Sequence, residues 1–570
     1  MAQKLTQMGQ RKDKSVPFCT EMVNLNTIFA SPFSSYLCPR LSFVMKRVRV
    51  RFAPSPTGPL HMGGVRTALF NYLFAKQQGG DFILRIEDTD SQRLVPGAEA
   101  YIVESLRWCH ILPNEGVLEN GEIATEPSPL HPHAPYRQSQ RKPLYRQYAE
   151  QLVAQGDAYY AFDTPESLET LRKEAEGRGE AFTYGPTTRA SLHNSLGMDA
   201  REVAQQLEQH NRWVIRFKIP QDEEVVFSDL IRGEVMVNSN TLDDKVLWKA
   251  VDELPTYHLA NVVDDHLMEI THVIRGEEWL PSLPLHILLY RAFAWQDTQP
   301  QFAHLSLLLK PDGKGKLSKR DGDRLGFPVF PLEWEVSKGY REEGYFPEAF
   351  VNMLALMGWN PGTEQEIFSL DELAQHFSLE RVVKSGARFN PEKAHWFNQQ
   401  YLRSKEMPEL VFAFAKLLKA TNTPFDPAKL PAIVALIKER ATFVKDFIDL
   451  SDYFFTAPTQ YDETLLSKYW KEDTPVKILA VKDFLSQIDP FTKEIIEETL
   501  PRFIKSNQWN MGAIMNALRL CIVGAPKGPG MANIMEIIGK EETLCRIDSL
   551  IHHIHNTPRH HHHFLDRSSA

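Results

Sequence analysis

A segment near residue 60 combines residue types that favour binding of a phosphate group. The run from Pro54 to Gly58 is a rigid, proline-rich turn, and His61 and the pair Gly63-Gly64 follow at the expected start of a helix. Exposed backbone N–H groups and the helix dipole attract anions there, and glycine lets a ligand approach closely. An ordinary strand-to-helix turn would use the same glycines, so this segment alone leaves both interpretations open.

A second segment, much later in the chain, has the composition of a mobile cationic loop. Such a loop could close over a triphosphate, where its lysines would stabilise the charge that develops as pyrophosphate leaves. A solvated basic loop is the alternative, and only the pairing with the first segment favours the binding interpretation. The residues are Lys310, Lys314, Lys316, Lys319, Arg320 and Arg324, among Gly313, Gly315 and Gly322.

The elements around the first segment are predicted to alternate as strand, helix and strand. Apolar residues alternate with basic ones over 47–52, the period of a strand, and recur at helical spacing over 63–78. Gly79-Gly80 ends that helix, and a strand over 82–86 leads into Glu87. This order predicts a parallel α/β sheet whose site lies at the carboxyl ends of the strands.

The α/β pattern stops and later resumes, which implies an inserted domain with charged helical stretches. After about residue 400 the pattern is almost wholly helical and indicates a separate α-helical domain. The predicted elements are a helix over 166–176 and strands over 214–219 and 234–237 in the insertion, then a strand over 270–274, a turn over 275–279 and a helix over 285–293, and finally helices over 408–418 and 431–447.

Length and composition narrow the class of protein. The 570 residues predict two to four domains, and 43% hydrophobic with 24% charged residues is typical of a soluble globular protein. No run of about 18 apolar residues indicates a membrane span. The five cysteines form no CxxC pair and fit a reducing compartment. The net charge of −9 leaves a nucleic-acid partner open, because such binding depends on the local arrangement of basic residues.

Both ends of the chain differ from the rest. Residues 1–44 could be an organellar transit peptide or the product of an upstream start codon, and Asp13 and Glu21 with Met45 before the first strand favour the second interpretation. A cytoplasmic location follows, with an organellar one as the alternative. The histidines of 560–563 indicate a tag or a tail.

Six landmarks together resemble a bacterial-type glutamyl-tRNA synthetase, a class I aminoacyl-tRNA synthetase. They are RFAPSPTGPLHMGG from Arg51, RIEDTD from Arg85, the run from Leu254 to Arg275, GEEW from Gly276, KLSKR from Lys316 and ARFNPEKAHWFN from Ala387. The resemblance covers about residues 45–550. It implies an α/β Rossmann-type catalytic domain with a parallel sheet over 45–140 and 246–330, split by an α+β acceptor-stem-binding insertion over 141–245, then a stem-contact region over 331–400, an all-α anticodon-binding domain over 401–552 and a tail over 553–570.

The resemblance also implies a role for each site residue. Glutamate carries two carboxylates and an ammonium, and arginine binds carboxylates bidentately. Arg51 is expected on the side-chain carboxylate, Arg275 on a carboxylate of the substrate, and Glu87 with Ser55 beside it at the α-ammonium. Tyr257 and Asn261, four residues apart, would share one helix face as polar contacts. For all of these, structural salt bridges or satisfied buried polar groups are the alternative.

The same resemblance assigns the ATP site and its catalytic groups. His61, Lys316 and Lys319 are implied as catalytic residues, and Pro54, Gly63 and Ser318 join them as ATP contacts. The second histidine of the HxGH signature is replaced by Gly64, a change common in glutamyl enzymes. In the KMSKS loop, Leu317 and Arg320 replace the methionine and the last serine, and the lysines remain.

Metal binding by the protein is not expected. Asp264, Asp265 and His266 could form a metal cluster, but this run is structural or peripheral in the family. Some relatives bind zinc through cysteines of the insertion, whereas Tyr159 to Phe162 contains none and Cys109 stands alone. ATP with Mg²⁺ and no zinc is the prediction.

The implied reaction forms glutamyl-adenylate and pyrophosphate from L-glutamate and ATP, and then transfers glutamate to the 3′ end of tRNA(Glu). The enzyme is expected to be a monomer that needs bound tRNA for the first step. A glutaminyl-tRNA synthetase, a truncated relative that glutamylates a modified tRNA base, and a catalytically inactive tRNA-binding module are the alternatives. We favour the glutamyl-tRNA synthetase. Its helical C-terminal region disfavours the first alternative, the length of that region disfavours the second, and the surviving cationic loop disfavours the third.

Overall fold

A mostly parallel six-stranded sheet, in the order β2-β1-β9-β10-β5-β6, forms the centre of the catalytic part. Neighbouring strands run parallel except β5 and β6, which form an antiparallel hairpin. The computed structural model describes residues 46–209 and 212–556. The strands are β1 (Arg49–Phe52), β2 (Asp81–Leu84), β5 (Glu224–Asp229), β6 (Gly233–Asn238), β9 (His272–Gly276) and β10 (Gln301–Leu305).

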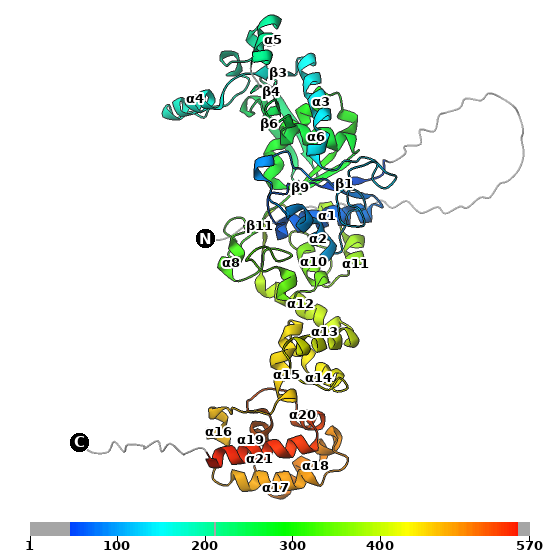
Figure 1. The fold of residues 1–570 in the computed structure, drawn as a ribbon, viewed down its shortest axis with the longest axis vertical. Helices are drawn as coiled ribbons and strands as arrows, with labels where there is room; N and C mark the ends of the chain where they lie inside the picture. The colour runs from blue at the N-terminus through cyan, green and yellow to red at the C-terminus, as the bar shows by residue number, and fades with distance from the viewer. Residues whose placement is uncertain (1–45, 210–211, 557–570) are drawn as a thin grey trace, which may run out of the picture. The chain divides into compact units, whose positions relative to one another are not determined.

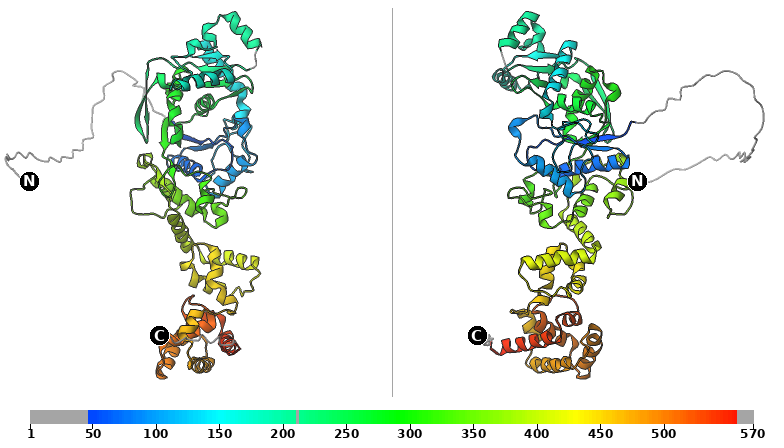
Figure 2. Two further views of the ribbon diagram at one scale, coloured as in Figure 1. Left: turned by 90° about the vertical axis from the view of Figure 1, so that its left-hand side faces the viewer. Right: turned by 45° about the vertical axis from the view of Figure 1, so that its right-hand side comes forward.

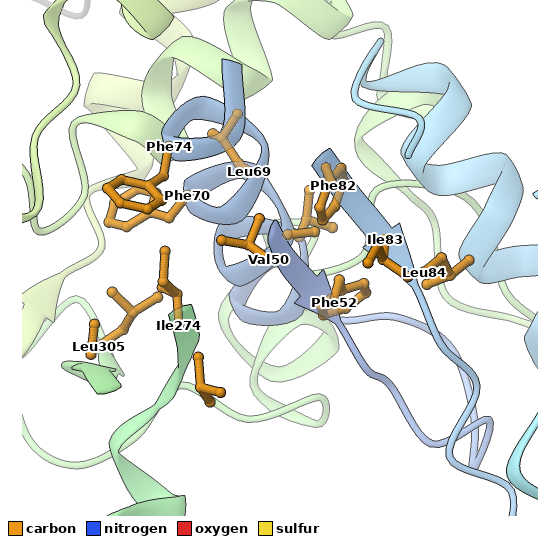
Figure 3. Close-up of a cluster of buried hydrophobic side chains, with 14 of the residues drawn as sticks. Val50, Phe52, Leu69, Phe70, Phe74, Phe82, Ile83, Leu84, Ile274 and Leu305 are labelled. Carbon is orange, nitrogen blue, oxygen red and sulfur yellow. The ribbon is translucent and has the colours of Figure 1, made fainter. Parts of the chain in front are cut away.

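Helix α1 (Met62–Gln77) packs along β1, as the blue elements of Figures 1 and 2 show. The helix begins at His61, whose side chain caps it, and its apolar residues face the sheet. In Figure 3, Val50 of β1 lies beside Leu69 and Phe70 of α1, and Ile274 and Leu305 extend the same core. Burial of such side chains contributes roughly 1.5–3 kcal/mol each. After α1, Gly80 lets the chain pass close to Val48 before β2 begins, since a Cβ at this position would lie 2.2 Å from the Val48 carbonyl oxygen.

Further helices and two smaller sheets complete the part of the chain up to Ser404. The four-stranded antiparallel sheet joins β3 (Ala158–Ala161), β4 (Val214–Phe217), β7 (Val246–Lys249) and β8 (Leu254–Pro255), and β11 (Leu308–Leu309) pairs with β12 (Ala387–Arg388). The helices are α2 (Ala98–Trp108), α3 (Lys142–Gln155), α4 (Pro165–Gly177), α5 (Ala200–Gln209), α6 (Tyr257–Leu267), α7 (Leu283–Ala292), α8 (Asp321–Leu325), α9 (Tyr340–Glu343), α10 (Pro347–Ala355), α11 (Leu370–His376) and α12 (Pro391–Ser404).

The last part of the chain is helical, as predicted, and has two hydrophobic cores of its own. Its helices are α13 (Met407–Ala420), α14 (Leu430–Ile437), α15 (Phe447–Phe455), α16 (Glu463–Tyr469), α17 (Thr474–Ser486), α18 (Lys493–Ser506), α19 (Met511–Val523), α20 (Met531–Ile538) and α21 (Lys540–Asn556). Helices α16 to α21 gather into one bundle in Figure 1. None of the described helices is long and apolar enough to cross a membrane.

Two sequence predictions need correction. The single helix over 431–447 is wrong, because α14 ends at Ile437 and α15 begins only at Phe447. Between them, the Asp446 carboxylate accepts the backbone N–H groups of Thr442 and Phe443 at 2.9 and 2.8 Å, and such side-chain bonds compete with a continuous helix. The predicted turn at 275–279 is also wrong at its start, since β9 extends through Gly276.

The sheet also takes in two strands from the range expected to form the insertion. β5 pairs with β10 in parallel, so the hairpin of β5 and β6 belongs to the catalytic sheet. The domain limits themselves stay predictions. The N-terminal extension over 1–44 lies outside the described residues, as do residues 557–570 of the tail.

Candidate active site

A cleft of about 1050 Å³ opens at the carboxyl ends of the parallel strands. This is where ligands bind in open α/β sheets, because the loops that follow the strands meet there. Segments far apart in the sequence, from β1 to the KLSKR loop, contribute its walls. Every site residue predicted from the sequence lines it, namely Arg51, Pro54, Ser55, His61, Gly63, Glu87, Tyr257, Asn261, Arg275, Lys316, Ser318 and Lys319.

Arg51 is held in the floor of the cleft by a buried carboxylate. Its Nε and Nη2 donate to Asp265 Oδ1 and Oδ2 at 3.0 and 3.3 Å, and Arg85 Nη1 donates to the same carboxylate at 2.7 Å. Burial acts to raise the pKa of Asp265, but Arg51 and Arg85 outweigh it and lower that pKa. The ionised Asp265 therefore fixes Arg51 through two of its nitrogens and leaves Nη1 outside the pair.

Glu87 is a buried carboxylate that lines the cleft. Arg85 Nη2 and Asn261 Nδ2 both donate to its Oε1, at 3.1 and 3.2 Å. Burial raises the pKa of Glu87, and Arg85 and Arg51 offset only part of this effect. A cationic group that enters the cleft would favour the ionised form again. Glu87 is thus suited to receive an ammonium group.

Arg275 and Tyr257 form a second polar pair in the cleft. Arg275 Nη1 donates to Tyr257 Oη at 2.7 Å, and the Tyr257 ring lies against Trp279, with 4.2 Å between the ring centroids. Tyr257 and Asn261 lie one turn apart on α6, as the spacing predicted. Arg275, Arg51, the Glu87 carboxylate and neutral polar groups therefore line the same cleft.

His61 offers a neutral hydrogen-bond donor at the start of α1. Its Nδ1 accepts the Gly63 N–H at 3.1 Å, so the ring proton lies on Nε2, a buried atom with no partner among the described residues. Burial, with Lys319 and Lys316 nearby, lowers the pKa of His61 to about 4. The imidazole is therefore neutral at physiological pH. The bond to Nδ1 also occupies the Gly63 N–H, which the sequence had suggested for a phosphate.

The KLSKR loop brings its two lysines to the cleft in different environments. Partial desolvation of the ammonium group lowers the pKa of Lys319, although the residue as a whole is exposed. Its Nζ lies 3.2 Å from the position a Cβ would take at Gly58, so glycine makes room for it. Lys316 Nζ pairs with Glu278 Oε1 at 3.2 Å. Ser318 N and Oγ both donate to Asp321 Oδ2, at 2.8 and 2.6 Å, which shapes the turn of the loop.

Comparison with known families matches both the catalytic part and the helical C-terminal part of the chain. Residues 47–396 match the family model described as tRNA synthetases class I (E and Q), catalytic domain, and residues 408–551 match an anticodon binding domain. The chain belongs to this class I synthetase family. The resemblance inferred from its motifs is therefore confirmed, as is the fold class of an α/β catalytic domain followed by a helical anticodon domain.

The synthetase has close relatives along nearly its whole length. It is 53% identical over 510 residues to the glutamate–tRNA ligase of Porphyromonas gingivalis, an overlap of 88% of this chain and 98% of the relative. The corresponding enzyme of Flavobacterium johnsoniae is 56% identical over 512 residues, which are 89% of this chain and 99% of the relative. A crystal structure of a glutamate tRNA ligase from Elizabethkingia meningosepticum in complex with its amino acid has a TM-score of 0.84 and 52% identity, and covers 89% of this chain and 99% of its own.

Packing explains the glycine that replaces the second signature histidine of the synthetase. A Cβ at Gly64 would lie 2.6 Å from Leu60 Cδ1 and 3.9 Å from Phe52 Cζ. Leu60 is buried, so a histidine here would have to displace it. His61 is therefore left as the one imidazole of residues 51–64.

The run from Asp264 to His266 is occupied by protein partners. Arg141 Nε, Gln138 Nε2 and Tyr145 Oη donate to the Asp264 carboxylate at 2.8, 2.9 and 2.7 Å. The ring of His266 stacks on Trp295 at 3.7 Å. Within residues 46–209 and 212–556, no group of three or more His, Cys, Asp or Glu side chains could hold a metal ion. The lack of zinc in the functional enzyme stays a prediction.

Two charged residues of the site were missed, although the sequence carried a signal for each. Arg85 lies two residues before Glu87, which is the spacing for one face of an extended chain. Asp265 follows Tyr257 and Asn261 at intervals of four, so all three lie on one face of α6. The run from Asp264 to His266 was expected to be structural or peripheral to the pocket, and the Asp265 carboxylate holds Arg51 in the cleft.

Replacing His61 with asparagine is expected to separate its two roles. The shorter amide can still accept the Gly63 N–H and cap α1, but it does not reach the place of Nε2. Thermal stability should remain near that of the wild type, whereas His61→Ala should lose about 1 kcal/mol with the cap. Both variants should slow ATP–pyrophosphate exchange roughly tenfold or more. An unchanged exchange rate in His61→Asn would rule out the donor role of Nε2.

Proposed function

We propose that the synthetase is a glutamate–tRNA ligase and that the cleft is its glutamate and ATP site. The observation that carries this proposal is the convergence of Arg51, Arg275 and Glu87 with His61 and the loop lysines in one cleft. Two carboxylates and one ammonium of L-glutamate would find opposite charges there. The names of the relatives support the same substrate.

The α-carboxylate of glutamate would attack the α-phosphorus of ATP, and the bond to pyrophosphate would break. His61 would donate from Nε2 to a phosphate oxygen, and Lys316 and Lys319 would stabilise the charge on the departing pyrophosphate. The terminal ribose hydroxyl of tRNA(Glu) would then attack the activated carbonyl and release AMP. Orientation by the arginines and Glu87 takes the place of a protein nucleophile.

Mg²⁺ would enter as the complex with ATP. Among the described residues, four carboxylates line the cleft, and each pairs with a protein cation: Glu87 with Arg85, Glu278 with Lys316, Asp252 with Lys249 and Asp90 with Arg93. Mg²⁺ prefers phosphate oxygens and water in sites of this kind. The residues present fit a metal held mainly by ATP, and zinc is not part of the proposal.

The remaining parts of the chain would bind tRNA(Glu). Residues 141–245 would contact the acceptor stem, residues 331–400 the stem below it and residues 401–552 the anticodon, in line with the anticodon-binding match. We propose that the enzyme is a monomer. We also propose that it acts in the cytoplasm, because five cysteines without a CxxC pair fit a reducing compartment.

ATP–pyrophosphate exchange tests this proposal, with glutamate or glutamine as substrate and with or without tRNA(Glu). We expect exchange with glutamate, dependent on tRNA. A control without amino acid reports background exchange. Exchange with glutamine alone, or no exchange even with tRNA, would refute the proposed function.

A further inference from the structure

Three buried side chains form a line behind the cleft, across neighbouring strands. Asp229 ends β5, His304 lies in β10, and Arg275 lies opposite His304 in β9. His304 Nδ1 lies 2.6 Å from Asp229 Oδ2, and Arg275 Nε donates to His304 Nε2 at 3.0 Å. The residues are 2%, 0% and 5% exposed, so water does not compete for these bonds.

Asp229 is fixed in place as an acceptor. Its Oδ1 accepts the backbone N–H groups of Ile231 and Arg232 at 2.9 and 2.8 Å in the turn after β5. Burial acts to raise the pKa of Asp229, but the bond to His304 and these N–H groups outweigh it and lower the pKa. An ionised carboxylate can only accept, so His304 must donate from Nδ1.

This choice of tautomer determines what His304 presents to Arg275. With the proton on Nδ1, Nε2 has a free lone pair and accepts the Arg275 Nε–H. Burial lowers the pKa of His304 despite the raising effect of Asp229, so the ring stays neutral. The guanidinium is therefore held at Nε by His304 and at Nη1 by Tyr257.

Arg275 differs from Arg51 in its charge balance. Arg51 pairs directly with Asp265, whereas the hydrogen-bond partners of Arg275 in the described part of the chain are all neutral: the ring of His304, the Tyr257 hydroxyl and the Trp279 carbonyl. The nearest carboxylate in this line, that of Asp229, acts only through His304. Arg275 thus keeps its positive charge available for a carboxylate in the cleft while its orientation is fixed.

We propose that Asp229 and His304 are positioning residues for glutamate binding, because they fix the plane of Arg275 without neutralising its charge. This inference rests on the proposed function, in which Arg275 binds a carboxylate of glutamate. Positioning side chains of this kind commonly matter nearly as much as the groups they orient.

The variant Asp229→Asn tests the tautomer directly. The amide Oδ1 can keep its bonds to Ile231 and Arg232, while Nδ2 faces His304 and drives the ring proton to Nε2. Two donors, Nε2–H and Arg275 Nε–H, then face each other, as when a catalytic histidine is held in the wrong tautomer. In tRNA(Glu) aminoacylation we expect the KM for glutamate to rise about tenfold or more, with the KM for ATP and the thermal midpoint little changed.

Asp81→Asn is the matched control. Asp81 is a buried carboxylate in β2 of the same sheet and pairs with Arg47 and Arg49, away from the line. This variant should leave the KM for glutamate unchanged. If Asp229→Asn raises this KM no more than Asp81→Asn does, the inference is wrong.

Two variants of His304 provide an independent test that also holds if Asp229→Asn fails to fold. Glutamine offers an amide oxygen to Arg275 and an NH₂ group to Asp229, whereas leucine offers neither. The KM for glutamate should therefore stay closer to the wild type in His304→Gln than in His304→Leu, and equal values would overturn the inference. A wild-type enzyme that does not glutamylate tRNA would instead refute the proposed function, and this inference with it.

Discussion

Arg51→Ala is expected to reduce kcat/KM for glutamate roughly a thousandfold, which corresponds to a loss of about 4 kcal/mol of transition-state stabilisation. The variant would leave a substrate carboxylate in a desolvated cleft without its cation. It would also remove one of the two arginines that hold the buried Asp265, although Arg85 remains at 2.7 Å. The loss should therefore fall on glutamate activation far more than on folding.

The measurement is tRNA-dependent ATP–pyrophosphate exchange over a range of glutamate concentrations. Arg47→Ala is the control, because this arginine lies just before β1 with a side chain 63% exposed, and it pairs with Asp81 outside the cleft. An Arg51→Ala enzyme with an essentially unchanged kcat/KM would disprove the assignment of Arg51.

Lys319→Ala is expected to slow glutamate activation by about a hundredfold or more, with a much smaller change in the KM for ATP. Lys319 Nζ lies beside Gly58, in space that a larger residue there would reduce, next to the segment that carries His61. A cation there acts mainly on charge that develops as pyrophosphate departs, so its loss should lower kcat rather than ground-state binding.

Single-turnover formation of glutamyl-adenylate would measure this effect. Lys314→Ala, an exposed lysine of the same loop that does not line the cleft, is the matched control. If Lys319→Ala instead raised the KM for ATP in proportion and left kcat intact, the lysine would be a binding group and not a transition-state one.

Local periodicity predicted the elements that surround the site well. Val48, Val50 and Phe52 alternate, and the apolar spacing after Gly63 gave α1 to within a residue or two. Both signals arise within a few neighbouring residues, because the spacing of apolar residues follows the period of the helix or strand that they form. The helix that was predicted over 431–447 failed because Asp446 binds backbone N–H groups, a competition that apolar spacing does not reveal.

Pairings between distant segments could not be predicted from such patterns. The strand predicted over 234–237 was real, but nothing in its sequence named β5 as its partner or the catalytic sheet as its place. The same limit applies to the site. The family resemblance suggested which groups could meet glutamate and ATP, whereas the bonds between Arg51 and Asp265 and between Arg275 and His304 depend on contacts far apart in sequence.

The order of strands in the catalytic sheet has a consequence for biosynthesis. β1 lies between β2 and β9, and Arg49 N bonds Thr271 Oγ1 across 222 residues of chain. As the chain leaves the ribosome, β1 and β2 emerge long before β5, β9 and β10. The edge of β1 that later pairs with β9 therefore stays unpaired, with its apolar residues exposed, until β9 has been made. Such edges favour aggregation and such distant pairings form slowly. We therefore expect the catalytic part to fold only once residues up to about Leu305 have been made, and its nascent chain to depend on chaperones until then.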